Sequence, residues 1–292
     1  MSIIITPAMV GQVVISGLLA GAIYSMVALG LALIFGVMRV INIAHGTILM
    51  LGAYTTFWWF QFLGINPYLS LLASMPLMFL LGLLIQRMFV TRVVDQPELS
   101  SLLLTFGISI ALVNFAQLVF TSDLRSVEFL TGAFLVGPIA ISKARLVSFA
   151  FAVTITVFAF WFIQKTKLGK AIRATSQSSE VAMVCGINVQ RIRLYAFGIA
   201  SALAGAGGSL VAVMFAIQPE IGQVYTFKSF LVIVLGGAGN YPGALVGGML
   251  LGLVEQLSSL FLTTQLSEAV AYLLLVLVLL LRPTGLLEGR AK

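Results

Sequence analysis

Apolar segments of about 20 residues recur along the whole chain, and this pattern constrains the fold more than any other feature. Because an α-helix needs about 20 apolar residues to cross a bilayer, it predicts an all-α, polytopic membrane protein with about eight transmembrane helices. Only 9% of the residues are charged, against about 25% in soluble domains, which excludes a soluble globular fold. We expect a single transmembrane domain over residues 1–292. The segments run approximately over 9–37, 43–63, 68–91, 99–121, 144–164, 194–218, 226–262 and 266–282.

The seventh segment, 226–262, is long enough for more than one helix, and the sequence GGAGNYPG (236–243) interrupts it. Pro242 disfavours a helical residue before it, and the preceding glycines mark a turn. We therefore expect a broken or re-entrant segment near 226–243, followed by a longer helix. The residues of this break that could line a pathway are Gly236, Gly237, Asn240 and Pro242.

Lys and Arg gather in the loops after the first, third and fifth segments and at the C-terminus. Since basic loops remain in the cytoplasm, this distribution predicts an outside N-terminus and an inside C-terminus, provided that 226–262 enters and leaves on one side. The net charge of +7 then reflects membrane orientation, and no nucleic-acid binding is expected. The basic residues include Arg39, Arg87, Arg92, Lys165, Lys167, Arg191, Arg193, Arg282, Arg290 and Lys292.

Ionisable residues inside the apolar segments are scarce, and His45, Glu255 and Glu268 have the best claims. We interpret Glu255 as an interfacial residue, and His45 as a hydrogen-bonded elbow near the cytoplasmic edge. Asn42 and His45 are also candidates for lining a pathway. With one His, one Cys and no Walker-type phosphate loop, no catalysis, metal or cofactor is expected on this chain.

Glycines spaced four residues apart occur in three pairs, Gly17/Gly21, Gly243/Gly247 and Gly248/Gly252. This spacing favours close helix packing in a bilayer. A second interpretation, that such contacts let helices slide during transport, stays open.

The longest charged interruption, about 165–193, is expected to form a cytoplasmic coupling loop. Ser178 can cap a short helix with Glu180 in its first turn, and Gly186 can end that helix in a left-handed conformation. The residues between them are apolar although they face the cytoplasm. Two interpretations follow: the helix folds back on the membrane surface, or it inserts into a cytosolic partner subunit.

Residues 180–186 resemble the coupling motif of ABC importer permeases, in which Glu, Ala and Gly have the spacing of Glu180, Ala182 and Gly186. Val181 stands where a middle alanine is usual, and the later I-x-L-P part of the motif is not evident. Four stretches resemble, in order, the branched-chain amino acid permeases of the Liv system, particularly the LivH type. They are GLLAGAIYSMVALGLALIFGVMRVINIAHGTILMLGAY (17–54), LGKAIRATSQSSEVAMVCGINVQRIR (168–193), FKSFLVIVLGGAGNYPGALVGGMLLGLVE (227–255) and LRPTGLLEG (281–289).

The resemblance implies one of two related permeases in a bacterial cytoplasmic (inner) membrane. It further implies two cytoplasmic ATPase subunits that bind ATP and Mg, and a periplasmic or lipid-anchored binding protein that delivers the substrate. The pathway would lie between the permeases, lined by apolar and small side chains. The residues that would couple this chain to the ATPases are Lys170, Arg173, Ser178, Glu180, Ala182 and Gly186.

Two alternatives remain open. The same permease family serves other cargoes, such as urea, short amides and other amino acids. A secondary carrier or a channel would be a different class of protein, against which the scarcity of buried coupling carboxylates argues.

Overall fold

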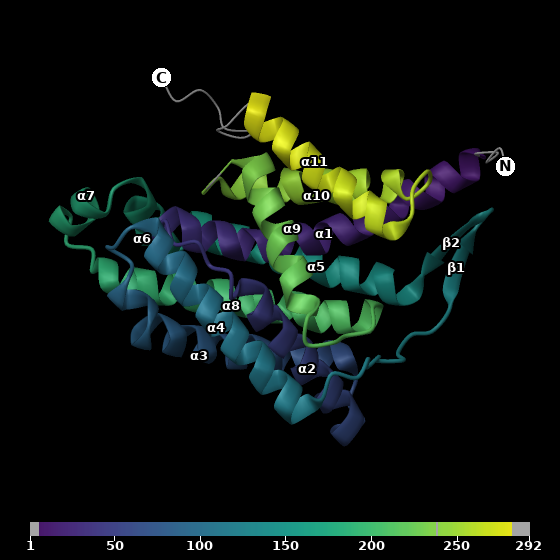
Figure 1. Cartoon of the computed structure of the whole chain (residues 1–292), viewed down its shortest axis with the longest axis horizontal. Helices are drawn as coiled ribbons and strands as arrows, with labels where there is room; N and C mark the ends of the chain where they lie inside the picture. The colour runs from purple at the N-terminus through teal and green to yellow at the C-terminus, as the bar shows by residue number, and fades with distance from the viewer. Residues whose placement is uncertain (1–5, 238, 282–292) are drawn as a thin grey trace.

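Figure 1 shows a computed structural model of the protein, which describes residues 6–237 and 239–281. The predicted helical class is confirmed, with one small hairpin in addition. The long helices are α1 (Pro7–Met38), α2 (His45–Leu63), α3 (Leu71–Met88), α4 (Glu98–Phe120), α5 (Lys143–Lys165), α8 (Val189–Met214), α9 (Ile221–Gly236), α10 (Tyr241–Ser258) and α11 (Thr264–Leu281). The shorter elements are the 3-10 turns η1 (Pro67–Ser70) and η2 (Val90–Arg92), the helices α6 (Lys167–Gln177) and α7 (Ser179–Val184), and the strands β1 (Ala133–Val136) and β2 (Ile139–Ser142).

Among the described residues, five helical segments are long and apolar enough to cross a membrane. They are α1, the unit Pro67–Arg92 that contains α3, and helices α4, α5 and α8. Counting the bent pair α9–α10 as one span gives six. The chain is thus a multi-pass membrane protein, and the count of about eight crossings stays a prediction. The basic residues at 282–292, on which the orientation of the C-terminus rests, lie outside the described residues.

Helix α1 forms the centre of the bundle. The hydroxyl of Thr6 caps it by accepting the N–H of Met9 at 3.4 Å, and Pro7 occupies the first turn, where an N–H has no helical partner. The helix is apolar on all sides and almost wholly buried from Gly17 onwards, as expected for a helix surrounded by others. Helices α5, α8, α9 and α10 pack around it.

Glycines bring α10 and α1 into close backbone contact. A Cβ on Gly17 would lie 2.9 Å from the carbonyl oxygen of Gly252, and one on Gly21 would lie 2.9 Å from the Cα of Met249. Gly248 meets the backbone of Ser25 in the same way. Because no larger side chain fits these positions, the predicted close packing of the glycine-rich segments is confirmed.

The chain between α1 and α2 returns along α1 before α2 begins. The imidazole Nε2 of His45 lies 2.9 Å from the carbonyl oxygen of Val27. Val27 is about 16 Å from the end of α1 at Met38, at 1.5 Å per residue. The predicted position of His45 near the cytoplasmic edge is therefore wrong, because the non-helical residues 39–44 carry the chain back along α1 before α2 begins. Its interpretation as a buried, hydrogen-bonded elbow is confirmed.

The break predicted within 226–262 is present. Helix α9 ends at Gly236 and α10 begins at Tyr241, and the two helices are bent by 118° relative to each other. Between them Gly237 and Gly239 have φ values of +92° and +77°, which only glycine adopts readily. In Figure 1, α9 runs steeply across the other helices. The α9–α10 unit begins five residues earlier than expected, at Ile221, and ends four earlier, at Ser258.

Both ends of this unit lie toward the same end of the bundle. The chain enters it beside Ile217, which pairs with Arg125 of the loop after α4. It leaves beyond Gly252, which packs on Gly17 in the first half of α1. This arrangement agrees with a segment that enters and leaves on one side.

The loop between α4 and α5 contains the hairpin of β1 and β2, which we did not predict from the sequence. Phe134 pairs with Ile141, and Val136 with Ile139, around a two-residue turn. Gly137 has a φ of +61°, which suits the first central position of a type II′ turn, and Pro138 follows it. The side-chain amide of Gln12 bonds the backbone of Ala140 in both directions at 2.8 Å, which fixes the hairpin to the start of α1.

Candidate functional site

The coupling segment, residues 165–193, lies at the end of α1 opposite the hairpin (Figure 1). The predicted short helix is α7, Ser179–Val184, and Ser178 caps it by accepting the N–H of Val181 at 3.3 Å. Glu180 lies exposed in the first turn, where a negative charge meets the positive end of the helix dipole. Asn188 caps α8 by accepting the N–H of Arg191 at 3.0 Å. The predicted short helix, its cap at Ser178 and the place of Glu180 in its first turn are confirmed.

Helix α7 exposes its apolar side chains. Val181, Met183 and Val184 are 62%, 55% and 89% exposed. Ala182 points inward and is 2% exposed. An apolar surface on a two-turn helix, anchored by one small buried residue, is typical of a segment that inserts into a partner. Cys185, directly after α7, is also exposed.

Gly186 ends α7 in a complete Schellman motif. Its N–H bonds Met183 O at 2.9 Å, and the N–H of Ile187 bonds Ala182 O at 3.0 Å. The φ of Gly186 is +80°, and a Cβ there would meet no atom within 4 Å. The requirement for glycine is therefore conformational and not a matter of space, and the predicted left-handed end of the helix is confirmed.

The two basic candidates of α6 lie in different environments. Lys170 is exposed, as a surface contact requires. Arg173 is half-buried, and its guanidinium donates to the carbonyl oxygen of Gln164 at 3.3 Å. Arg173 thus holds α6 to the end of α5, and the structure does not bring it to the exposed face of α7.

Two polar cavities adjoin the coupling segment. One of about 450 Å³ lies between the end of α1, the link before α4 and residues 175–180, and it includes Arg39 and Arg193. Arg193 forms an ion pair with Asp95 at 3.1 Å. The second, of about 390 Å³, is lined by α6 and the end of α1, and also by Gly239 and Tyr241. The break between α9 and α10 is thus a direct neighbour of the coupling segment.

Most of the residues predicted to line a pathway shape the turn between α9 and α10 or cap α10. Gly236 packs against Gly243 at the turn, and Gly237 has the positive φ described above. Asn240 caps α10 by accepting the N–H of Gly243 at 3.1 Å, and Pro242 lies in the first turn. Asn42 is fully buried in the link between α1 and α2, and neither of its amide atoms has a hydrogen-bond partner among the described residues. A pathway role for these residues stays a prediction.

A buried ionic cluster was missed from the sequence. Lys228 of α9 is 8% exposed and forms an ion pair with Glu255 of α10 at 2.7 Å. Its ammonium also donates to the hydroxyl of Tyr24 at 3.1 Å and lies 3.7 Å from Glu268 of α11. Glu255 is itself 8% exposed, and its position near the membrane interface stays a prediction. The signal available in the sequence was a Lys within the apolar run FKSFLVIV (227–234), because an intramembrane charge needs a partner.

The cluster weakens one argument made from the sequence. A scarcity of buried carboxylates no longer speaks against a carrier, since Glu255 is such a carboxylate. The carboxylate is balanced by Lys228, however, and this pairing is also typical of a fixed contact between helices.

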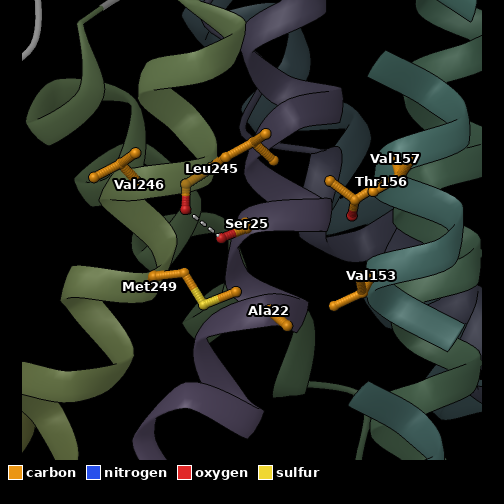
Figure 2. A pocket seen from close by; sticks show the side chains of 8 residues that line it. All are labelled: Ala22, Ser25, Val153, Thr156, Val157, Leu245, Val246 and Met249. Atoms are coloured by element: carbon orange, nitrogen blue, oxygen red, sulfur yellow. Dashed lines mark hydrogen bonds between the residues drawn. The ribbon is translucent and has the colours of Figure 1, made fainter. Parts of the chain in front are cut away.

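An apolar hollow of about 300 Å³ lies beside the middle of α1, and Figure 2 shows the side chains that line it. Ala22 and Ser25 of α1 line it together with residues of α5 and α10, among them Val153, Thr156 and Met249. The hydroxyl of Ser25 donates to Leu245 O at 2.8 Å, while that of Thr156 has no hydrogen-bond partner among the described residues. The lining thus consists of small and apolar side chains.

Residues 13–279 match the model of the family described as the permease component of branched-chain amino acid transport systems. The permease LivH of Salmonella typhimurium is 32% identical over 94% of each chain. BraD of Pseudomonas aeruginosa is 32% identical over 94% of this chain and 95% of its own. A ribose import permease, RbsC of Haemophilus influenzae, is 26% identical over 41% of this chain. No solved structure gives a significant match.

The chain therefore belongs to the family of branched-chain amino acid transport permeases, and the resemblance seen in the sequence is confirmed. It is a membrane-embedded subunit of an ABC importer and not an enzyme. The similarity covers both the coupling segment and the α9–α10 unit.

Proposed function

We propose that this chain forms, with a second homologous permease, the pathway for branched-chain or related hydrophobic amino acids across a bacterial cytoplasmic membrane. Two cytoplasmic ATPase subunits bind ATP and Mg and drive transport, and a periplasmic or lipid-anchored binding protein delivers the cargo. The cargo is proposed from the relatives, which are named as branched-chain amino acid permeases over nearly their whole length. Urea, short amides and other amino acids are the alternative cargoes.

The observation that carries the ATPase partnership is α7 with its exposed apolar residues Val181, Met183 and Val184. The cap at Ser178 and the Schellman motif at Gly186 define both ends of this helix. It can therefore enter a groove of a partner as a preformed unit, without a large loss of conformational entropy. Glu180 and Lys170, both exposed, supply charged contacts at the rim of that groove.

Motion of α7 would reach the membrane through α6 and α8, which flank it in the chain. The cavity beside α6 is shared with Gly239 and Tyr241 at the start of α10, and α10 packs along α1 through glycines. When the ATPase subunits close on ATP, a displacement of the coupling segment is thus applied to the α9–α10 break. The side-chain-poor contact between α10 and α1 offers little resistance to sliding.

The proposed orientation places the N-terminus outside and the C-terminus inside. Arg39 and Arg193 meet in one cavity with the coupling segment, so these basic loops share one end of the bundle, which the positive-inside rule assigns to the cytoplasm. The hairpin and the start of α1 lie at the other end. The apolar hollow beside α1 supplies the small and apolar lining expected of a low-affinity conduit.

Purified complexes in proteoliposomes test the coupling role. Glu180→Lys is expected to abolish the stimulation of ATP hydrolysis by cargo-loaded binding protein, together with uptake, because it reverses the charge at the start of α7. Glu128→Lys, which changes an exposed acidic residue of the opposite loop, is the matched control and is expected to behave as wild type. Wild-type stimulation in Glu180→Lys would contradict the coupling role. Uptake that proceeds without ATP would instead identify a carrier or channel.

A further inference from the structure

The cluster of Lys228, Glu255, Glu268 and Tyr24 contains two carboxylates and one ammonium group. Neither carboxylate has another basic residue within ion-pair distance in the part of the chain that the structure describes. Fully charged, the cluster therefore carries one negative charge in excess. The excess lies with Glu268, because Lys228 and Glu255 form a balanced buried pair. A carboxylate without a close cation of its own favours a ligand that supplies one.

Two features show where a compensating group would bind. Oε1 of Glu255 accepts from Lys228, while its Oε2 is buried without a hydrogen-bond partner among the described residues. The ammonium of Lys228 lies 3.7 Å from Glu268, too far for a good hydrogen bond. In the described part of the chain, the cluster thus has one carboxylate oxygen without a hydrogen-bond donor, next to an ion pair that is too long for a good hydrogen bond.

One of the two carboxylates of the cluster is also accessible from outside the chain. The side chain of Glu268 is 35% exposed, against 10% and 11% for Lys228 and Glu255. Glu255 lies one turn beyond Gly252, which packs on Gly17 in the first half of α1, toward the end of the bundle that carries the hairpin. In the proposed orientation this is the outer half of the membrane, from which cargo arrives.

We propose that this cluster is a recognition site for the charged end of a zwitterionic α-amino acid as it passes through the permease. The inference rests on the proposed function. The ammonium of the cargo is accepted by Glu268 and by Oε2 of Glu255, and its carboxylate replaces Glu268 as the partner of Lys228. The ammonium of the zwitterion offsets the unpaired carboxylate locally, while its carboxylate takes a place beside Lys228, and each new pair is a charge-assisted hydrogen bond.

The order of affinities follows from the charges. Two carboxylates face one ammonium, so the ammonium of a ligand gains more than its carboxylate does. Of two half-ligands with the skeleton of leucine, 3-methylbutylamine should bind better than 4-methylpentanoate. The reverse order would contradict the proposed site.

Binding of radiolabelled L-leucine to the assembled transporter in nanodiscs, without binding protein, tests the site. We expect weak, saturable binding, with a dissociation constant in the millimolar range. Glu268→Gln should weaken it at least about tenfold, as the loss of a charge-assisted contact does. Glu128→Gln, an exposed carboxylate of the outer loop, should leave it unchanged. On wild type, 3-methylbutylamine should displace L-leucine at least about tenfold better than 4-methylpentanoate.

Unchanged L-leucine binding in a correctly assembled Glu268→Gln transporter would overturn the proposal and leave the cluster as a fixed tie between helices. If that variant does not assemble, the competition on wild type decides alone, and equal competition by the amine and the acid overturns the proposal. Uptake of L-leucine by wild-type proteoliposomes with ATP and binding protein is measured in parallel. If uptake occurs and binding lacks the predicted order, only the recognition site is wrong. If L-leucine is not taken up at all, the proposed cargo and the recognition site are both wrong.

Discussion

The contacts within the coupling segment and those within the Lys228 cluster differ greatly in the sequence separation of the residues that they join. In the coupling segment, the bonds that define α7 are local: Ser178 bonds Val181, Gly186 bonds Met183 and Ile187 bonds Ala182, each within five residues. In the cluster, Lys228 meets Tyr24 and Glu255, which are 204 and 27 positions away. The first region can form its shape locally, whereas the second exists only after α1, α9 and α10 have packed. Damage to the cluster should therefore unfold the bundle, and damage to the coupling segment should impair function alone.

The largest expected loss of stability is that caused by Lys228→Met. Because this change leaves the buried carboxylate of Glu255 unpaired, we expect a loss of about 3–5 kcal/mol of stability, measured by thermal unfolding of the detergent-purified complex. Lys228→Met with Glu255→Leu should recover most of the loss. Asp95→Asn, which removes the 76%-exposed partner of Arg193, should cost no more than about 1 kcal/mol. A fully stable Lys228→Met protein would show that the cluster does not hold the helices together.

A smaller effect is expected at the contact that places α9 against α2. A Cβ on Gly222 would overlap the backbone of Gly46, so Gly222→Ala should cost about 1–3 kcal/mol through overpacking. Gly107→Ala on α4 adds the same methyl group where no atom lies within 4 Å, and it should leave stability unchanged or slightly higher. Unfolding midpoints of the two variants provide the measurement. Equal midpoints would mean that α9 can shift to accommodate the methyl group.

The smallest effect on stability is expected in the coupling segment. Gly186→Val places a β-branched residue in the left-handed region, at a cost of about 1–2 kcal/mol, which frays α7 while the bundle remains folded. Hydrogen exchange over 178–188 should rise, and the stimulation of ATP hydrolysis should fall. Gly186→Asn is the matched control, because asparagine tolerates this conformation. Equal exchange in the two variants would show that the left-handed stop does not define the helix.

The same difference in sequence separation explains which features could be predicted from the sequence. The caps at Ser178 and Asn188 and the stop at Gly186 were predictable, because each depends on residues a few positions away. The break at GGAGNYPG was predictable for the same reason. Lys228 was missed because its partners Glu255 and Glu268 lie on other helices, and a single Lys in an apolar run has no local pattern. The depth of His45 was also mispredicted, since spacing from Arg39 does not show that residues 39–44 return along α1.

The hairpin shows a different kind of failure. Its turn, Gly137–Pro138 between two apolar runs, is a local signal of the kind that the coupling segment provides. No structure was predicted for this loop, although the signal is local. Local chemistry therefore predicts structure at both ends of this bundle, whereas its interior requires knowledge of how the helices pack.

Cys185 gives the chain a natural reporter. It is the single cysteine among 292 residues, and it is exposed directly after α7. A thiol-reactive fluorophore or spin label would therefore attach to this permease at one position without any engineered substitution, within two residues of Val184 and Gly186. Its signal would follow the coupling segment through each round of ATP binding and release.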